Sequence, residues 1–488
     1  MSGQTIQVTT LNDSGVGSLR AAITQANADA TKTASPDLIT FASGLTGSID
    51  LQTPLPDITD SIEIEGPGAR LITIDAGAVP RSADAPVLYD DTPSSSLTIS
   101  GLTVANAYGG AYRGGFLYAE HATVRLLDDS FSHDSAPGDK QGGAGGGGAV
   151  YAHFSSLTAY GCLFTDNHGD YGGALAVTEG TLSVIDSTFA NNSARGFGGA
   201  INLAGSTGTV TASTITGNSV KYTGPPSGPD GGHIGYGGGI AALGASKLTL
   251  IDSIVAGNHA SGNAMATPPR PSTNHRDVYI DVDDGSQLTA LFSLIENDIQ
   301  GLPLNSSDIT GKSPDLGPLQ NNGGETNTEV PFATSPVINA GTAVGLGVDQ
   351  RGFRRTVSFP VRKQRLIPGK LIRRKHHRPR RGPSRVVHYF LLQSGTDIGA
   401  TELQPYVIGP QQRVASIGDS VIITGSGFTD ARAIWFGSQA AAKFTVLSDT
   451  TIDVLVPSGT GTVGVSVITP AGVSANGPND KFTYVTPS

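Results

Sequence analysis

Apolar residues recur through the middle of the chain in a repeat of constant inner spacing. Each unit opens with a glycine, has a large apolar residue sixteen positions later, and has an Asp or Asn three positions after that. The five units contain Gly115, Phe131 and Asp134; Gly148, Phe164 and Asn167; Gly173, Phe189 and Asn192; Gly199, Ile215 and Asn218; and Gly239, Val255 and Asn258. The units recur after 33, 25, 26 and 40 residues, so variable length enters between the Asn and the next glycine. Such self-similarity is typical of solenoids.

Within each unit, apolar and polar residues alternate with a period of two, which predicts strands. A short strand cannot bury an apolar face alone, but turns stacked about 4.8 Å apart line equivalent residues into a continuous core. We therefore predict an all-β fold, a parallel β-helix with two or three strands per coil. One large apolar residue from each repeat is expected to form a single buried file: Phe131, Phe164, Phe189, Ile215 and Val255. A structural ladder is predicted at one corner, because Asn tolerates left-handed backbone and its amide can hydrogen-bond along the axis. Its members are Asp134, Asn167, Asn192, Asn218 and Asn258.

The ends of the solenoid need caps, because terminal coils expose unpaired strand edges. Residues 1–35 are predicted to form the N-terminal cap, with a short amphipathic helix between Ser18 and Ala28. Its apolar residues at helical spacing are Leu19, Ala22, Ile23 and Ala26. The β-helix itself is predicted to span residues 36–350.

Several ordered motifs at the two ends of this region resemble the CSLREA and choice-of-anchor Q group of bacterial surface proteins. They are VTTLNDSGVGSLRAAITQANA (residues 8–28), GPLQNNGG (317–324), SPVINAG (335–341), DQRGF (349–353) and DIGATE (397–402). The resemblance implies a right-handed parallel β-helix on an extracellular or cell-surface protein, and it implies no catalytic residue. The first residues, MSGQTIQVTT, lack the basic and apolar run of a signal sequence. The surface location is therefore an expectation from the resemblance alone.

The C-terminal region, residues 409–488, resembles an IPT/TIG domain, which is an immunoglobulin-like β-sandwich. The motifs are GDSVIITGSGF (418–428), IWFG (434–437), TIDVLVP (451–457), GVSVITPAG (464–472) and FTYV (482–485). Short alternating strands separated by Gly-rich turns agree with this fold, and Trp435 is predicted to anchor its core. Residues 397–408 are predicted to be a closing segment and linker.

Composition and charge single out one further segment. The 488-residue chain has 66 Gly, only 15% charged residues and a net charge of -10, and its single Cys162 excludes an internal disulfide. No apolar run reaches the roughly 18 residues of a membrane span. Residues 351–385 nevertheless contain 14 Lys and Arg and no Asp or Glu. We predict that residues 351–396 form a basic, disordered insertion; a misassembled stretch of coding sequence, or an arm that binds nucleic acid or acidic polysaccharide, are the alternatives.

A candidate ligand-binding face follows from the alignment of the repeats. Tyr118 and Tyr151 fall in one outward column, and Glu120 and His153 fall in the next. Aromatic rings beside acid and base groups suit a carbohydrate platform, and the alternative is a stacking ladder that stabilises the sheet. The long insertions enter at one corner, where they either wall a groove beside these residues or are Gly/Pro-rich decoration. They cover residues 135–147, 219–238 and 259–277.

These observations favour a non-catalytic scaffold or adhesion protein that binds polysaccharide or other surface proteins, acts as a monomer and needs no cofactor. The alternative is a polysaccharide lyase or glycosidase, which requires several carboxylates, or a carboxylate with Arg or Lys, to converge in the groove. The segment YIDVDDG (279–285) has some character of a calcium site but lacks the spacing of a calcium loop. Nucleic-acid binding is the least favoured class. The carboxylates considered are Asp128, Asp129, Asp166, Asp170, Asp281, Asp283 and Asp284.

Overall fold

The computed structural model forms two compact units, which are described separately. Unit 1 comprises residues 1–355 and 397–402, and unit 2 comprises residues 356–396 and 403–488. The structure describes residues 3–485 except for 29–34, 82–84, 111–113, 138–145, 222–234, 262–276, 298–303, 333, 343, 354, 356, 368–370, 373–379, 382–384, 430, 470–471 and 475–479. Residues 357–395 are described as backbone.

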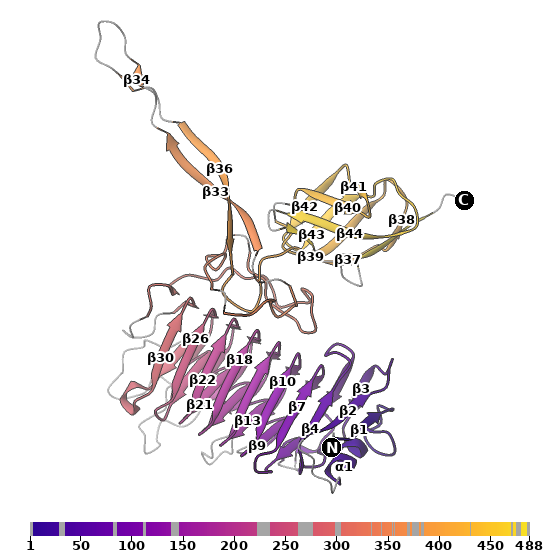
Figure 1. Cartoon of the computed structure of the whole chain (residues 1–488), viewed down its shortest axis with the longest axis vertical. Coiled ribbons are helices and arrows are strands. Elements are labelled where there is room, and N and C mark those ends of the chain that lie inside the picture. Colours follow the sequence, from indigo (N-terminus) through magenta and orange to yellow (C-terminus); the bar gives the residue numbers. More distant parts are fainter. Residues whose placement is uncertain are drawn as a thin grey trace. The chain divides into compact units, whose positions relative to one another are not determined.

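Unit 1 is a parallel β-helix, as predicted, and two of its sheets contain ten strands each. Figure 1 shows the strands of sheet A side by side in chain order, from indigo to pink. Sheet A consists of β1 (Thr5–Val8), β2 (Asp37–Phe41), β4 (Ile62–Glu65), β7 (Ser96–Ser100), β10 (Thr123–Leu127), β14 (Ser156–Tyr160), β18 (Thr181–Ile185), β22 (Thr207–Thr211), β26 (Lys247–Ile251) and β30 (Gln287–Leu291). Sheet B consists of β3 (Gly47–Asp50), β5 (Ile72–Asp75), β8 (Thr103–Ala105), β11 (Ser130–Ser132), β15 (Leu163–Thr165), β19 (Thr188–Ala190), β23 (Thr214–Thr216), β27 (Ile254–Ala256), β31 (Leu294–Ile295) and β32 (Ile309–Thr310).

Two further parallel sheets complete the coils, so the central coils have four strands rather than the two or three predicted. Sheet C consists of β6 (Leu88–Asp90), β9 (Leu117–Glu120), β13 (Val150–His153), β17 (Leu175–Thr178), β21 (Ile201–Ala204), β25 (Ile240–Leu243) and β29 (Val278–Ile280), the last followed by the short 3-10 helix η2 (Val282–Asp284). Sheet D consists of β12 (Ser135–Ala136), β16 (His168–Tyr171), β20 (Ser193–Phe197), β24 (Ser219–Lys221) and β28 (His259–Ser261). Sheet D has a small apolar core of its own, formed by Ala194, Val220 and Ala260.

The predicted apolar file is present in sheet B. Phe131, Phe164, Phe189, Ile215 and Val255 pair in direct register and are all fully buried. The three phenyl rings stack with centroids 4.9 and 4.6 Å apart. Sequence offsets in this repeat therefore correspond to neighbours in space.

The repeat glycines allow consecutive coils to approach each other closely. A Cβ on Gly115, Gly148 or Gly173 would lie 2.2, 2.0 or 1.9 Å from the carbonyl oxygen of the next repeat glycine. No side chain fits at such distances, so these positions require glycine.

The ladder residues lie at a corner, but the left-handed residue there is the one that precedes each of them. His133, Asp166 and Asn191 have φ of 59°, 56° and 58°, followed in later coils by Gly217 and Gly257. The expectation that the ladder Asn itself is left-handed is therefore wrong. The preceding residue turns the chain, which points the ladder side chain inward, where its amide bonds to neighbouring coils.

The N-terminal helix forms as predicted. Helix α1 (Leu19–Asn27) begins after Ser18, whose hydroxyl accepts a hydrogen bond from the amide of Ala21, an N-cap that satisfies one free N–H of the first turn. Its buried residues are Leu19, Ala22, Ile23 and Ala26. They pack into the main core of the β-helix and so cover its first coil.

The other end is covered by a closing module, defined here as residues 304–355 with residues 397–402. Its apolar residues Val337 and Ile398 pack on Ile254 and Leu294, which face outward from sheet B. The side chain of Gln350 accepts a hydrogen bond from Thr188 and donates one to the carbonyl of Cys162. The closing module therefore covers the outer face of sheet B rather than only its last coil.

The boundaries of the predicted basic insertion need correction. Arg351 and Arg355 lie in unit 1. Both can be buried because each forms an ion pair with a carboxylate there. Beyond them, β33 (Val357–Ile367) and β36 (Arg385–Gly395) form an antiparallel pair, and β34 (Leu371–Ile372) pairs with β35 (Arg380–Arg381). The predicted lack of regular structure thus differs from the backbone seen here; the rest of the insertion lies outside the described residues.

Unit 2 also contains an antiparallel sandwich with the core residues Phe428, Phe436 and Phe482. Its strands are β37 (Tyr406–Pro410), β38 (Val414–Ala415), β39 (Ser420–Ser426), β40 (Ala433–Phe436), β41 (Gln439–Ala440), β42 (Phe444–Ser448), β43 (Thr451–Leu455), β44 (Thr462–Thr469), β45 (Gly472–Val473) and β46 (Lys481–Tyr484). Trp435 is only partly buried, because alternation along β40 turns Ile434 and Phe436 inward instead. Its predicted role as core anchor is wrong. The sandwich also starts earlier than residue 409, at β37.

Candidate functional site

The outward face of sheet C contains the predicted tyrosines. Tyr89, Tyr118 and Tyr151 occupy one column of β6, β9 and β13 in direct register. The rings of Tyr89 and Tyr118 stack with centroids 5.3 Å apart and planes 9° from parallel, whereas Tyr151 lies 5.4 Å from Tyr118 and is tilted by 54°. The tilt interrupts the stack at Tyr151, so this ring is not covered face to face by Tyr118.

Glu120 and His153 lie in the adjacent outward column and are bonded to each other. The His153 Nδ1 is 3.2 Å from Glu120 Oε1, and the Tyr118 hydroxyl donates to Glu120 Oε2 at 2.8 Å. Burial and the hydrogen bond to Glu120 both raise the pKa of Tyr118, so its phenol stays protonated and remains a donor. The side chains of His153 and Glu120 are 24% and 23% exposed. The four predicted residues thus form one contiguous group.

Two further aromatic residues extend this group at the corner between sheets C and A. His121 and Phe154 have left-handed backbone, with φ of 56° and 47°, and their rings stack 5.2 Å apart. The Phe154 ring lies 4.1 Å from that of His153 and is 44% exposed. Left-handed backbone recurs at the equivalent corner of the following coils, at Glu179, Gly205 and Gly244, so it belongs to the turn and the two rings project from equivalent positions. The two residues are 33 positions apart, the same spacing as Gly115 and Gly148, so the repeat contained the signal for them.

We define the tyrosine face as Tyr89, Tyr118, Glu120, His121, Tyr151, His153 and Phe154. The polar groups of Tyr118, Glu120 and His153 are hydrogen-bonded to one another, the Tyr151 ring stacks on His153 at 6.2 Å, and Phe154 presents exposed aromatic surface. Such a combination of apolar ring and adjacent polar group suits a ligand that is itself amphipathic.

A second aromatic stack, on the side of sheet D, was missed by the sequence analysis. Tyr171, Phe197, Tyr236 and Tyr279 come from four successive coils, with neighbouring centroids 5.7, 5.9 and 4.4 Å apart and interplanar angles of 28°, 18° and 17°. Because neighbouring rings cover each other's faces, this arrangement is a stacking ladder. The signal was available, since Tyr171 and Phe197 each lie two positions before a repeat glycine.

Sheet D also contains an ion pair beside a histidine. Arg195 Nε lies 3.3 Å from Asp170 Oδ1, and His168 Nδ1 lies 3.0 Å from the Ser193 hydroxyl. Burial, followed by the Arg195 guanidinium, lowers the pKa of His168, which keeps this imidazole neutral. His168 and the candidate carboxylate Asp170 both lie on β16, in a sheet that was not predicted.

Four of the other candidate carboxylates have structural positions. Asp128 and Asp166 are left-handed corner residues, and Asp129 is buried and accepts hydrogen bonds from the amides of Leu102 and Leu127. Asp284 accepts from the amide of Ser286 and from residues of the preceding coil. In the described part of the chain, no group of three or more His, Cys, Asp or Glu side chains is arranged to hold a metal ion. Most of the three long insertions lies outside the described residues.

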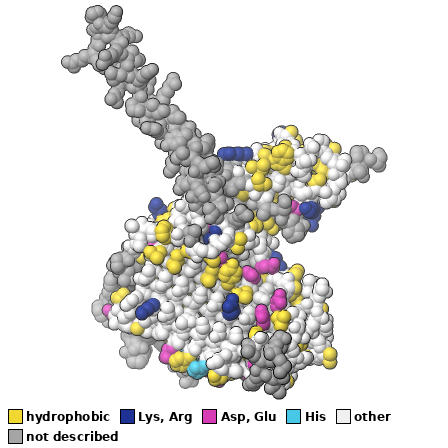
Figure 2. Space-filling view, viewed as in Figure 1, with side chains coloured by type: hydrophobic (Ala, Val, Ile, Leu, Met, Phe, Trp, Pro, Cys, Tyr) yellow, Lys and Arg dark blue, Asp and Glu magenta, His cyan; other side chains and the backbone are white. Residues whose placement is uncertain are grey.

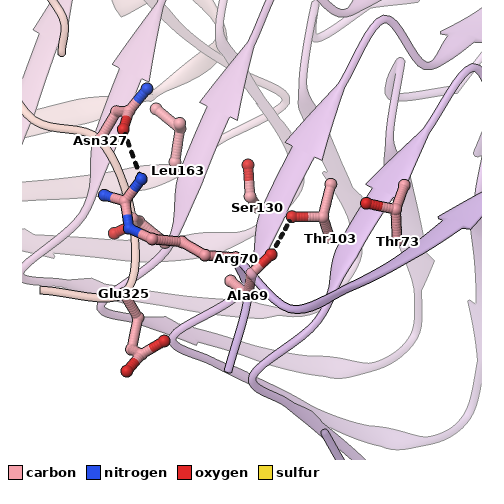
Figure 3. Close-up of a pocket in the computed structure, with 9 residues that line it drawn as sticks. Ala69, Arg70, Thr73, Thr103, Ser130, Leu163, Glu325 and Asn327 are labelled. Atoms are coloured by element: carbon pink, nitrogen blue, oxygen red, sulfur yellow. Dashed lines mark hydrogen bonds between the residues drawn. The ribbon is translucent and has the colours of Figure 1, made fainter. Parts of the chain in front are cut away.

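Two cavities lie on the outer face of sheet B, at opposite ends of β5, β8 and β11. The first has a volume of about 340 Å³ and is lined by Arg70, Thr73, Thr103, Ser130, Glu325 and Asn327, among others. Figure 3 shows Arg70 reaching Asn327 on one side and the Thr103 and Thr73 side chains in a row on the other. The second, of about 240 Å³, is lined by residues that include Arg81, Asn106, Tyr108 and His133.

The protein is thus a parallel β-helix with aromatic side chains on its outward surface, joined to a sandwich domain. Residues 404–484 match the family of the IPT/TIG domain, so the C-terminal region is an IPT/TIG domain. No curated protein sequence matches the chain. Among the described residues, no helix has the length and apolar character needed to cross a membrane.

Proposed function

We propose that this protein is a non-catalytic scaffold that binds polysaccharide along the tyrosine face of its β-helix. The observation that carries the proposal is the continuous group of Tyr118, Tyr151, Glu120 and His153, extended by the exposed ring of Phe154. Aromatic rings pack against the C–H faces of sugars, and carboxylate and imidazole groups bond their hydroxyls.

The geometry of the coils supports a linear ligand. Equivalent side chains repeat about every 4.8 Å along the axis of a stacked parallel sheet, which is close to the length of one sugar unit in a polysaccharide chain. A chain lying parallel to the axis would meet Tyr89, Tyr118 and Tyr151 in turn. Figure 2 draws one face of the molecule, on which charged side chains stand among many uncharged ones. The tyrosine face itself contains the acid Glu120 and no Lys or Arg, which disfavours a polyanion as its ligand.

A surface location and membership of the CSLREA and choice-of-anchor Q group belong to the same proposal. Supporting it are the cap motif around Leu19, which covers the first coil, and the closing motifs around Asp349 and Asp397, which fold together against the outer face of sheet B. The IPT/TIG domain would then act as a spacer or a second binding module.

A carbohydrate-active enzyme is the second candidate, and the Asp170–Arg195 pair beside His168 favours it. Hydrolysis of a glycoside normally uses two carboxyl groups about 5 to 10 Å apart. On sheet D the described residues contribute one carboxyl group, Asp170, which forms an ion pair with Arg195. The arrangement supplies one of the two groups, so binding remains the better-supported function.

Binding of soluble neutral polysaccharides to the whole protein tests the proposal. Replacing Tyr118 and Tyr151 together by Ala should weaken binding at least tenfold, because the aromatic surface is removed. The matched control replaces Tyr171 and Phe197 by Ala, a pair of the same kind on sheet D, and should change affinity less than twofold. Circular dichroism verifies that both double variants keep the strand content.

Two outcomes would overturn the proposal. Unchanged affinity after Tyr118→Ala/Tyr151→Ala would remove the tyrosine face as the binding site, and loss of affinity only in the control would move the site to sheet D. Release of reducing ends from the polysaccharide that is abolished by Asp170→Asn would instead establish the enzyme.

A further inference from the structure

We propose that the outer face of β5, β8 and β11 is a second binding site, which takes a short neutral oligosaccharide laid along the strand direction. It goes beyond the tyrosine face because it lies on another sheet and binds through hydroxyl, amide and charged groups. We define this polar strip as the two sheet B cavities and the outward residues between them.

The floor of the first cavity is a row of hydroxyl groups. Thr73, Thr103 and Ser130 pair in register and face outward, and all three are partly exposed. Thr103 Oγ1 donates to the carbonyl of Ala69 at 2.5 Å, so its oxygen is oriented as an acceptor. The next residue of this column, Leu163, is only 4% exposed. The row of hydroxyls therefore ends where the closing module begins to cover the sheet.

The walls of the cavity come from parts of the chain that are far apart in sequence. Arg70 donates from Nε to the carbonyl of Gly324 at 3.2 Å and from Nη1 to Asn327 Oδ1 at 3.1 Å. These bonds fix the guanidinium beside the floor, as Figure 3 shows. Glu325 packs against Gly68, where a Cβ would come within 2.6 Å of its Oε2. The closing module thus builds the cavity as well as covering the sheet.

The positive charge in the cavity is offset by nearby carboxylates, which disfavours an anion as the ligand. The positive charge of Arg70 lies in the same wall as the carboxylate of Glu325, and Asp128 lies near enough to Glu325 for the two charges to interact. Donors and acceptors are therefore both available without excess positive charge. That pattern matches the vicinal hydroxyl groups of a neutral sugar, which donate to carboxylates and accept from guanidinium groups.

The second cavity lies at the other end of the same three strands and extends the strip. Arg81 lies over the ring of Tyr108 at 5.1 Å, and Asn106 Nδ2 donates to Asp75 Oδ1 at 3.1 Å. Thr103 and Asn106 are three residues apart along an extended strand, about 10 Å. Because this span exceeds one sugar unit, a ligand that reaches both cavities must be an oligosaccharide.

The cavity volume agrees with this ligand class. The first cavity, at about 340 Å³, lies at the lower end of the range of about 300 to 1,000 Å³ found for small-molecule sites. It is therefore large enough for a terminal unit, and the remainder of the chain would continue across Asp75 and Ser132 towards Arg81.

Saturation-transfer NMR on the full chain tests the site, with neutral mono-, di- and trisaccharides of glucose, galactose and mannose as probes. The trisaccharide of the preferred sugar should bind at least fivefold more tightly than its monosaccharide. Thr73→Val with Ser130→Ala keeps the side-chain sizes similar while removing two floor hydroxyls, and should weaken binding at least fivefold. The matched control, Thr98→Val on the outward face of β7, should change it less than twofold.

Further arms separate the alternatives. The Tyr118→Ala/Tyr151→Ala variant should keep trisaccharide binding to the strip, so failure of one site does not imply failure of the other. Arg81→Gln should weaken trisaccharide binding and leave monosaccharide binding unchanged. The proposal is wrong if no neutral saccharide gives a signal, if the floor variant behaves like wild type, or if inorganic phosphate or glucuronate displaces the trisaccharide.

Discussion

The β-helix buries polar groups in two contrasting ways. The asparagine ladder, formed by Asp134, Asn167, Asn192, Asn218 and Asn258, repeats one hydrogen bond from backbone N–H to side-chain amide through five coils. The closing cluster, formed by Asp186, Asp349, Arg351, Arg355 and Glu402, is a single charged arrangement. Both are almost completely inaccessible to solvent, so their polar groups need partners inside the protein. The ladder supplies these partners by hydrogen bonds between amides, and the closing cluster supplies them by ion pairs.

Each inner rung of the ladder uses its amide fully. Asn192 Oδ1 accepts from the backbone and the side-chain nitrogens of Asn167 at 3.1 and 3.0 Å. Asn192 Nδ2 donates to the carbonyl of Phe164 and to Asn218 Oδ1, both at 2.9 Å. At the first rung, burial raises the pKa of Asp134 well above its usual value, which favours the neutral acid where other coils have an amide. The ladder thereby avoids buried charge.

The closing cluster instead buries charges and compensates them in part. Arg355 pairs with Asp186 and, at 3.2 Å, with Glu402, and Arg351 pairs with Asp349 at 2.7 Å. Two arginines therefore face three carboxylates in the cluster. The excess of carboxylates makes the closing module sensitive to pH, whereas the ladder has a single titratable member, Asp134.

Removing one inner rung gives the largest expected effect. Asn192→Ala leaves the backbone N–H of Asn167 without its acceptor inside the protein, and we expect a loss of about 3 kcal/mol of unfolding free energy. Urea denaturation measures this loss, and hydrogen exchange should show reduced protection of the Asn167 amide.

The neighbouring position provides a matched control. Asn191 is exposed and left-handed, so Asn191→Gly fits the same backbone and should change stability by less than about 0.5 kcal/mol. If the Asn192→Ala and Asn191→Gly variants were equally stable, the ladder hydrogen bonds would contribute nothing to the free energy of unfolding.

This contrast explains which parts of the molecule could be predicted from the sequence. The file from Phe131 to Val255 and the ladder were predictable, because five coils repeat one pattern and each confirms the register of the others. Arg355 meets Asp186 across 169 residues, and nothing in the repeat encodes that contact.

The residues on the outer faces of the β-helix could be predicted only in part. The repeat was sufficient to place Tyr118, Tyr151, Glu120 and His153 in neighbouring columns. It gave no account of sheet D, whose strands vary in length, or of the polar strip, whose walls come from residues 254 positions apart, as Arg70 and Gly324 are.

The pH dependence of stability tests the closing cluster together with Asp252, a neighbouring buried carboxylate that interacts with Arg355. Burial raises the pKa of Asp252 to about 7, although Arg355 partly opposes this, and it also raises the pKa values of Asp186 and Glu402. Because these folded-state pKa values exceed those of the unfolded chain, their contribution is complete below the unfolded pKa and is lost as pH rises through the folded one. Thermal melting should therefore show that stability falls between pH 5 and pH 8, by about 2 kcal/mol for Asp252.

The neutral variant Asp252→Asn isolates this contribution. It keeps an oxygen that accepts from the Thr342 amide, at 3.1 Å in the wild type, and should flatten the profile between pH 5 and pH 8. A steeper fall in the variant, or a wild-type stability that rises with pH over this range, would contradict the assignment.

Deletion of residues 358–394, which contain most of the paired strands β33 and β36, should have the smallest effect on stability. The chain leaves unit 1 after Arg355 and returns at Asp397, and both residues bond to Glu402: Arg355 through Nη1 at 3.2 Å, and Asp397 through its amide at 2.9 Å. Val357 and Gly395 are also paired across β33 and β36, so a two-residue Asn-Gly turn can join them in place of residues 358–394. Because the contacts described for the closing cluster lie outside the deleted segment, the melting temperature of the β-helix should change by less than about 3 °C. The deletion also removes 11 of the 14 basic residues counted between 351 and 385, and should abolish any salt-sensitive binding to nucleic acid. A large loss of stability would show that the segment supports the fold, and would place it with the closing module instead of with an insertion.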